Sequence, residues 1–178
     1  MSISELKREI PDFAKDLRIN IGNVLDIDQA EGMTEQQIWL TALATALTSK
    51  NTRLIEAISA EAGTHLDEQA MDAARSASAI MGMNNIYYRF LHLASNDQYQ
   101  KMPAKLRMSV IGNPGIDKVD FELVSLAVSA VTGCGLCVDS HEKILLKAGM
   151  RPEVIQHSVR IASVIHAVAG VLETKDIG

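Results

Sequence analysis

The chain has 178 residues, of which 47% are hydrophobic and only 4% aromatic, and its formal net charge is −5 at pH 7. This length fits one domain spanning residues 1–178, and the scarcity of aromatic residues favours closely packed helices over strands. The negative charge and the lack of a Lys/Arg run exclude nucleic acid as an expected partner. No apolar run reaches the ~20 residues that span a bilayer, and the N-terminus lacks the apolar core of a signal peptide. We therefore expect a cytoplasmic protein with no membrane partner.

Capping signals and apolar periodicity predict helices throughout the first half of the chain. Ser2 and Glu5 have the spacing of a capping box, as do Thr34 and Gln37, so a helix should follow each pair. A helix starting at Pro11 should present one apolar face, made of Phe13, Leu17, Ile21 and Leu25. Beyond the first short helix, the predicted helices of this half cover residues 11–26, 34–51, 52–62 and 67–91, with a loop at 26–33.

The second half is also predicted to be helical. Residues 95–103 are the most polar connector, and Asn113-Pro114-Gly115 is a turn signal. Any boundary within the chain falls between about residues 93 and 116. The last helix is apolar nearly all round, so it should be central in the fold or buried in a subunit contact. The predicted helices of this half cover residues 103–111, 117–132, 134–148 and 153–174, which makes the fold class all-α.

The helix at 117–132 contains a β-branched run that could also suggest a strand. Its polar residues favour a helix, because their separations of three, four and three place them on one stripe: Glu122, Ser125, Ser129 and Thr132. Gly133 then interrupts the pattern. The two helices on either side of this short break should pack antiparallel.

A weak internal repeat relates two segments, about residues 34–92 and 116–175. Both have the order helix, break, helix, glycine, long helix. The first segment has Trp39 and Asn51 where the second has Glu122 and Cys134. If the duplication is real, only the second half-repeat is expected to carry chemistry.

The two cysteines of the chain, Cys134 and Cys137, stand three residues apart at the predicted start of a helix. In the cytosol such a pair is more typical of catalysis, redox chemistry or metal binding than of a structural disulfide. Their i, i+3 spacing puts both sulfurs on one helix face, close enough for a disulfide. The helix N-terminus favours the thiolate, which attacks peroxides and disulfides. His141 lies on the same face, four residues beyond Cys137.

Glu122 is the candidate partner for this histidine. Counted along two antiparallel helices, Cys137 lies about 4.5 Å, His141 about 10 Å and Glu122 about 18 Å from the break. Two long side chains, or one side chain and a water, can span the remaining gap between Glu122 and His141. Glu122 would then hold the imidazole while His141 takes or gives the proton at sulfur.

Other assignments have weaker support. Zinc is the main rival, but only Asp139 or Glu122 could complete a site with the two cysteines and His141, and no second CxxC or His pair exists. A c-type haem would need histidine at Val138. We expect the other histidines and a methionine cluster to be structural: His65, His92 and His157 on the surface or at caps, His166 in the core, and Met71, Met81 and Met83 in core packing.

The pattern Glu122…Cys134-x-x-Cys137-x-x-x-His141 resembles the redox-active branch of the carboxymuconolactone decarboxylase-like superfamily. Further stretches resemble its AhpD family in particular, and the resemblance covers essentially the whole chain. They are Met81-Gly82-Met83-Asn84-Asn85-Ile86-Tyr87-Tyr88-Arg89, Arg107-Met108, Asn113-Pro114-Gly115-Ile116 and Phe121-Glu122-Leu123.

The resemblance implies an all-helical subunit of a homo-oligomer, a trimer or a multiple of trimers. It implies an antioxidant enzyme that reduces alkyl and hydrogen peroxides and the disulfide of an AhpC-type peroxiredoxin. Cys137 would form the sulfenic acid, and Cys134 would donate a proton and resolve it to a Cys134–Cys137 disulfide. Glu122 and His141 would relay the proton.

The electron donor implied by the resemblance is dihydrolipoamide on a dihydrolipoamide acyltransferase, recharged by dihydrolipoamide dehydrogenase and NADH. No tightly bound cofactor and no metal are implied. The chain departs from the family pattern at Leu136, where relatives carry a histidine, so a relay through a second imidazole is absent. Two other functions stay open: a redox-sensing or interaction protein without turnover, and a carboxymuconolactone decarboxylase-type enzyme.

Overall fold

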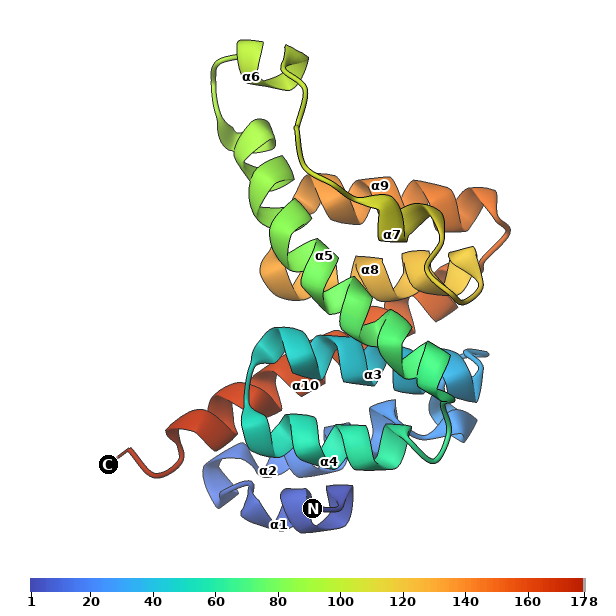
Figure 1. Ribbon diagram of the computed structural model, residues 1–178. Coiled ribbons are helices and arrows are strands. Elements are labelled where there is room, and N and C mark those ends of the chain that lie inside the picture. The colour runs from blue at the N-terminus through green and yellow to red at the C-terminus, as the bar shows by residue number, and fades with distance from the viewer. Residues whose placement is uncertain (178) are drawn as a thin grey trace.

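The computed structural model describes residues 1–177, and within this range every regular element is a helix (Figure 1). The predicted all-α fold class is therefore confirmed. Short 3₁₀ turns occupy Asp12–Ala14 and Ile27–Gln29. The α-helices are α1 (Ile3–Glu9), α2 (Lys15–Val24), α3 (Glu35–Ser49), α4 (Thr52–Ala62), α5 (Glu68–Leu93), α6 (Gln98–Lys101), α7 (Ser109–Gly112), α8 (Lys118–Thr132), α9 (Gly135–Lys147) and α10 (Pro152–Thr174).

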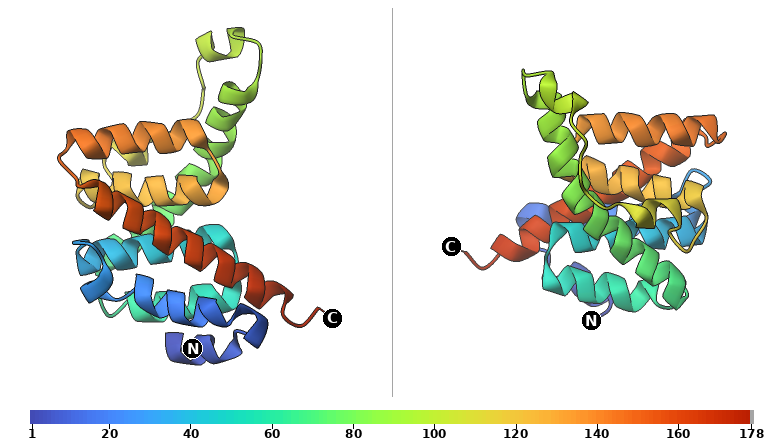
Figure 2. Two further views of the ribbon diagram at one scale, coloured as in Figure 1. Left: turned by 180° about the vertical axis from the view of Figure 1, so that it is seen from behind. Right: turned by 45° about the horizontal axis from the view of Figure 1, so that its top comes forward.

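Two sets of three helices, α3–α5 and α8–α10, form the body of the fold, and the long third helix of each set also packs across the other set. The helix α5 packs against α3 of its own set and continues across α8 and α9 of the other set. In return, α10 packs against α8 and crosses α3, as the view from behind in Figure 2 shows. Each set is thus covered by the last helix of the other.

Matching local features start and end the helices of the two sets. Both α3 and α8 have 15 residues, and each ends at a residue in the left-handed region, Lys50 (φ 62°) and Gly133 (φ 71°). The next residue, Asn51 or Cys134, then caps the following helix through its own side chain. The cysteine thus occupies a capping position in the second set that an asparagine fills in the first.

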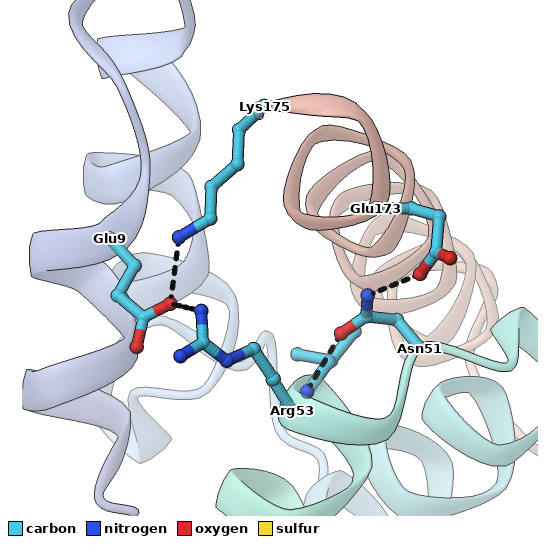
Figure 3. A network of polar contacts seen from close by, with 6 residues as sticks. Glu9, Asn51, Arg53, Glu173 and Lys175 are labelled. Atoms are coloured by element: carbon cyan, nitrogen blue, oxygen red, sulfur yellow. Dashed lines mark hydrogen bonds and ion pairs between the residues drawn. The ribbon is translucent and has the colours of Figure 1, made fainter. Parts of the chain in front are cut away.

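A polar network ties the two ends of the chain together (Figure 3). The carboxylate of Glu9 accepts hydrogen bonds from Nη1 of Arg53 at 2.5 Å and from Nζ of Lys175 at 2.9 Å. Nearby, Nδ2 of Asn51 donates to Oε2 of Glu173 at 2.8 Å. The hydrogen bond from Lys175, followed by the charges of both cations, holds the pKa of the Glu9 carboxyl below its ordinary value despite its partial burial. Helices α1, α4 and α10 are therefore joined at one corner of the molecule.

The core lies around α3 and α10. Residues 38–46 of α3 are all buried, so this helix is enclosed on every side. The helix α10 packs against α2, α3 and α8, in agreement with its predicted central position. By length and composition α10 could also cross a bilayer, but half of its most apolar 18-residue window is buried inside the fold. Core helices of soluble proteins can have the same length and hydropathy.

Two predictions about local structure were wrong. Phe13 is 78% exposed, because residues 12–14 form a 3₁₀ turn that is out of phase with the apolar face of α2. No helix covers residues 103–108; Met102, which precedes a proline, is extended (ψ 141°), and Lys105 adopts a left-handed conformation (φ 52°). The helical turns of this region lie on either side, as α6 and α7.

One of the remaining histidines has its predicted role and another does not. His157 is buried, and its Nε2–H donates at 3.0 Å to the carbonyl of Val24 at the end of α2, so it is a cap but not a surface residue. His166 was predicted to be in the core but is exposed, with Nδ1 3.2 Å from Oγ of Ser49. It lies on the solvent side of α10, because α10 buries only part of its circumference.

Candidate active site

The sharp turn between α8 and α9 places both cysteines. Gly133 ends α8 in the left-handed conformation that glycine adopts without steric cost. The N–H of Cys134 then bonds to the carbonyl of Ser129 at 3.1 Å, which closes the turn. The chain enters α9 directly and returns alongside α8, as the sequence predicts.

Cys134 and Cys137 are joined by a disulfide, and their Cα atoms lie 5.3 Å apart. Cys134 caps α9, because its sulfur accepts a hydrogen bond from the backbone N–H of Cys137 at 3.3 Å. After reduction, the positive end of the α9 dipole favours a thiolate within the cysteine pair. Cys134 has no exposed surface, whereas Cys137 is 6% exposed and lines a cavity. Only Cys137 therefore faces a space that a small molecule can enter.

Glu122 on α8 and His141 on α9 are in direct contact. Oε2 of Glu122 lies 2.5 Å from Nδ1 of His141, and the two side chains are only 14% and 12% exposed. The contact is closer than the sequence required, since no water is needed to bridge the pair. An ionised carboxylate only accepts hydrogen bonds, so Nδ1 carries the proton and Nε2 is the nitrogen free for proton exchange.

A cavity of about 440 Å³ brings these groups together. Cys137, Glu122 and His141 are its chemically reactive residues. The remaining wall is mostly apolar and comes from α5, the segment around α7, and α9: Met81, Asn84, Asn85, Tyr88, Met108, Ile111, Leu136, Ser140 and Ile144. Leu136 is 38% exposed and lines the cavity beside Cys137, so this position offers an alkyl group and no imidazole.

The helix α5 also anchors the end of α8 just before the cysteines. Nδ2 of Asn85 donates to Oγ1 of Thr132 at 2.7 Å, and Oδ1 of Asn85 accepts from Oγ of Ser129 at 3.1 Å. Nη1 of Arg89 donates to the carbonyl of Thr132 at 2.5 Å. The polar stripe of α8 thus finds partners on α5. Sequence reasoning missed these α5 residues, although two adjacent asparagines in a helix rich in Ala and Met were a signal.

The zinc alternative finds no support in the side-chain arrangement. Asp139 is exposed and pairs with Nζ of Lys143 at 2.7 Å instead of approaching the cysteines. Within residues 1–177, no group of three or more His, Cys, Asp or Glu side chains has the arrangement of a metal site. The groups that do converge are a dithiol pair, an imidazole and a carboxylate, a combination suited to thiol redox chemistry.

Comparison with known proteins gives the same family along the whole chain. The model of the carboxymuconolactone decarboxylase family matches residues 97–176, which contain all four predicted site residues. A protein named alkyl hydroperoxide reductase AhpD from Rhodospirillum centenum is 53% identical over 98% of this chain and 92% of its own length. Proteins of the same name from Methylocella silvestris and Brucella anthropi are 52% and 53% identical, over 99% of this chain and 98% and 99% of their own lengths.

Identity at this level over nearly full length extends beyond the redox motif. It includes α5, which lies outside the matched family segment and yet supplies part of the cavity wall. The cysteine pair, the Glu122–His141 contact and the full-length similarity agree, and the chain belongs to the AhpD family of alkyl hydroperoxide reductases.

Proposed function

We propose that this protein is an antioxidant thiol peroxidase and disulfide reductase. The observation that carries the proposal is the position of Cys137, the one cysteine that faces a largely apolar cavity beside the Glu122–His141 pair. The apolar wall suits the carbon chain of an alkyl hydroperoxide, and the cavity volume also admits hydrogen peroxide. The names of the AhpD relatives support the same reaction class.

In the proposed reaction, the thiolate of Cys137 attacks the hydroxyl oxygen of the peroxide. An S–O bond forms and the O–O bond breaks, so sulfur is oxidised to sulfenic acid while the peroxide is reduced. The departing alkoxide takes a proton supplied by Cys134, relayed by His141, whose imidazole Glu122 orients. Cys134, now a thiolate, attacks the sulfur of the sulfenic acid, hydroxide leaves and takes a proton from the solvent to become water, and the Cys134–Cys137 disulfide forms.

The disulfide must be reduced before the next turnover. We assign dihydrolipoamide as the donor, carried by a dihydrolipoamide acyltransferase and recharged by dihydrolipoamide dehydrogenase. The largely apolar cavity wall suits the aliphatic chain of a lipoyl group. The same dithiol pair would reduce an AhpC-type peroxiredoxin through a mixed disulfide with Cys137, because Cys134 has no exposed surface.

The proposal includes a cytoplasmic homo-oligomer, a trimer or a multiple of trimers. Supporting it, α5 exposes three large apolar side chains on one side of its C-terminal half, where the helix projects from the body in Figure 1: Ile86, Phe90 and Leu93. Light scattering coupled to size exclusion would give the subunit number directly. A monomer at micromolar concentration would contradict this part of the proposal.

The test is steady-state consumption of cumene hydroperoxide with dihydrolipoamide as the donor, with and without an AhpC-type peroxiredoxin. Cys137→Ser should abolish consumption, because Cys134 has no exposed surface and no other cysteine lines the cavity. Cys134→Ser should instead allow one oxidation of Cys137 without disulfide formation. Undiminished turnover by Cys137→Ser would refute the assignment. A single stoichiometric oxidation by the wild type would favour a redox sensor over an enzyme.

A further inference from the structure

Asn84 is a buried polar residue of the cavity wall, and it has no role in the reaction proposed for Cys137, Cys134, His141 and Glu122. Only 4% of it is exposed, and its Oδ1 has no hydrogen-bond partner among the described residues. The adjacent Asn85 is different, because both ends of its carboxamide bond to α8. Asn84 lies on the α5 face that also presents Met81 and Tyr88, at i−3 and i+4, and all three line the cavity.

An unpaired carbonyl of this kind is costly in a folded protein. Leaving a buried acceptor without a partner costs about 1–3 kcal/mol, and more than nine in ten buried polar groups avoid this cost. A leucine has the same arrangement of heavy atoms and would carry no such penalty. The polar group is placed instead against the cavity that contains Cys137 and His141, which points to a ligand that supplies the missing donor.

We propose that the carboxamide of Asn84 binds the hydroxyl group of the hydroperoxide, with Oδ1 accepting its O–H hydrogen bond. This inference rests on the proposed function and adds a substrate-binding residue to it. A hydroperoxide carries one donor, the O–H, and Oδ1 is an acceptor without a partner. Oδ1 is buried in this structure, but the terminal torsion of asparagine is soft, so rotation of the carboxamide can turn Oδ1 toward the cavity that Asn84 lines.

This contact determines which oxygen meets the sulfur. The proton held by Asn84 belongs to the oxygen that Cys137 attacks, so the O–O bond is directed away from the thiolate and the alkoxide leaves on the far side. That proton stays on its oxygen throughout, and the sulfenic acid formed at Cys137 can donate it to the same Oδ1. The proton for the alkoxide still comes from the Cys134 and His141 relay. The Asn84 contact changes neither the bonds that form and break nor the two electrons that pass from sulfur to the peroxide.

The variant Asn84→Leu tests this assignment, with each half-reaction measured separately. Oxidation of the reduced protein by cumene hydroperoxide, followed as loss of free thiols after rapid quenching, should slow about tenfold, equivalent to about 1.4 kcal/mol. Reduction of the disulfide by dithiothreitol involves no hydroperoxide and should stay within twofold of wild type. Alkylation of the reduced protein by iodoacetamide should be equally unaffected, which would show that the thiolate is intact.

Thermal stability separates a binding role from a structural one. Asn84→Leu removes an unpaired polar group, so the melting temperature of the variant should equal or exceed that of wild type. If Asn84 were needed for the fold, the variant would melt at a lower temperature than wild type. Asn23→Leu, at an exposed asparagine of α2 outside the cavity, is the matched control and should change neither half-reaction.

Different outcomes overturn different statements. If wild type reacts with the peroxide and Asn84→Leu reacts equally fast, the assignment of Asn84 is wrong and the proposed function stands. Equal slowing of both half-reactions with a lower melting temperature would also overturn it. If wild type itself does not react, the proposed function fails and this inference fails with it.

Discussion

Replacing Glu122 by Gln should slow peroxide reduction strongly while leaving the fold intact. Glutamine has the same shape and can still accept a hydrogen bond from Nδ1 of His141, so the ring keeps its position. The negative charge is lost, however. The neutral glutamine cannot stabilise the imidazolium that forms whenever Nε2 of His141 takes up a proton during the relay.

The expected size of the effect follows from the geometry. The two side chains are 14% and 12% exposed, and their contact at 2.5 Å is therefore poorly screened by water. A hydrogen bond to a charged group in such a place contributes about 1.5–3 kcal/mol. If this contribution is made when the imidazolium forms, the rate should fall by roughly 10- to 150-fold.

The assay is the reaction of reduced protein with cumene hydroperoxide under single-turnover conditions, which excludes the recharging step. Glu142→Gln is the matched control, because Glu142 is the exposed neighbour of His141 on α9 and lies outside the cavity. It should behave as wild type. A rate for Glu122→Gln within twofold of wild type, with an unchanged melting temperature, would refute the charge-stabilisation argument.

Two further predictions concern stability against pH, measured by urea unfolding between pH 3 and 8. Burial raises the pKa of Asp120 above its ordinary 3.8, and the hydrogen bond from Gln37 at 2.6 Å only partly offsets this. The folded state therefore loses stability as pH rises through this range. Asp120→Asn should be more stable than wild type at neutral pH and equal to it near pH 3; a less stable variant at pH 7 would contradict this. The pKa of Glu9 is lowered, mainly by Lys175, so its contribution is present at neutral pH and disappears as pH falls below the carboxyl range. Glu9→Gln should cost up to about 1 kcal/mol at pH 7 and nothing near pH 3, and a pH-independent loss would show that charge is not the cause.

The sequence was sufficient for the parts of the fold that depend on local patterns. The helix starts after Ser2 and Thr34 follow from capping boxes, and both boxes are present. The α8–α9 hairpin follows from Gly133 and from the separation of polar residues along α8. Since a short antiparallel hairpin has few possible registers, the approach of Glu122 to His141 could also be predicted, although not whether the two side chains would meet directly or through a water.

The sequence was insufficient where distant segments decide the outcome. The partners of Ser129 and Thr132 come from Asn85, more than 40 positions earlier, and no local pattern indicates which helix will cross α8. His157 looks like a surface residue until α2 is placed against α10. Asn84 looks like a neutral helix position until the cavity forms beside it. These residues depend on tertiary packing, which outweighs local preference.

The exchange of long helices between the two sets has a consequence for how this enzyme can be divided and recombined. A fragment starting at residue 116 would retain Glu122, both cysteines and His141 but would lose the α5 wall of the cavity. Co-expressed halves should therefore recover activity only on reassembly, even though one half contains every residue of the redox motif. The helices α8 and α9 keep a complete cavity wall only while α5 remains beside them, although α5 carries none of the four predicted site residues.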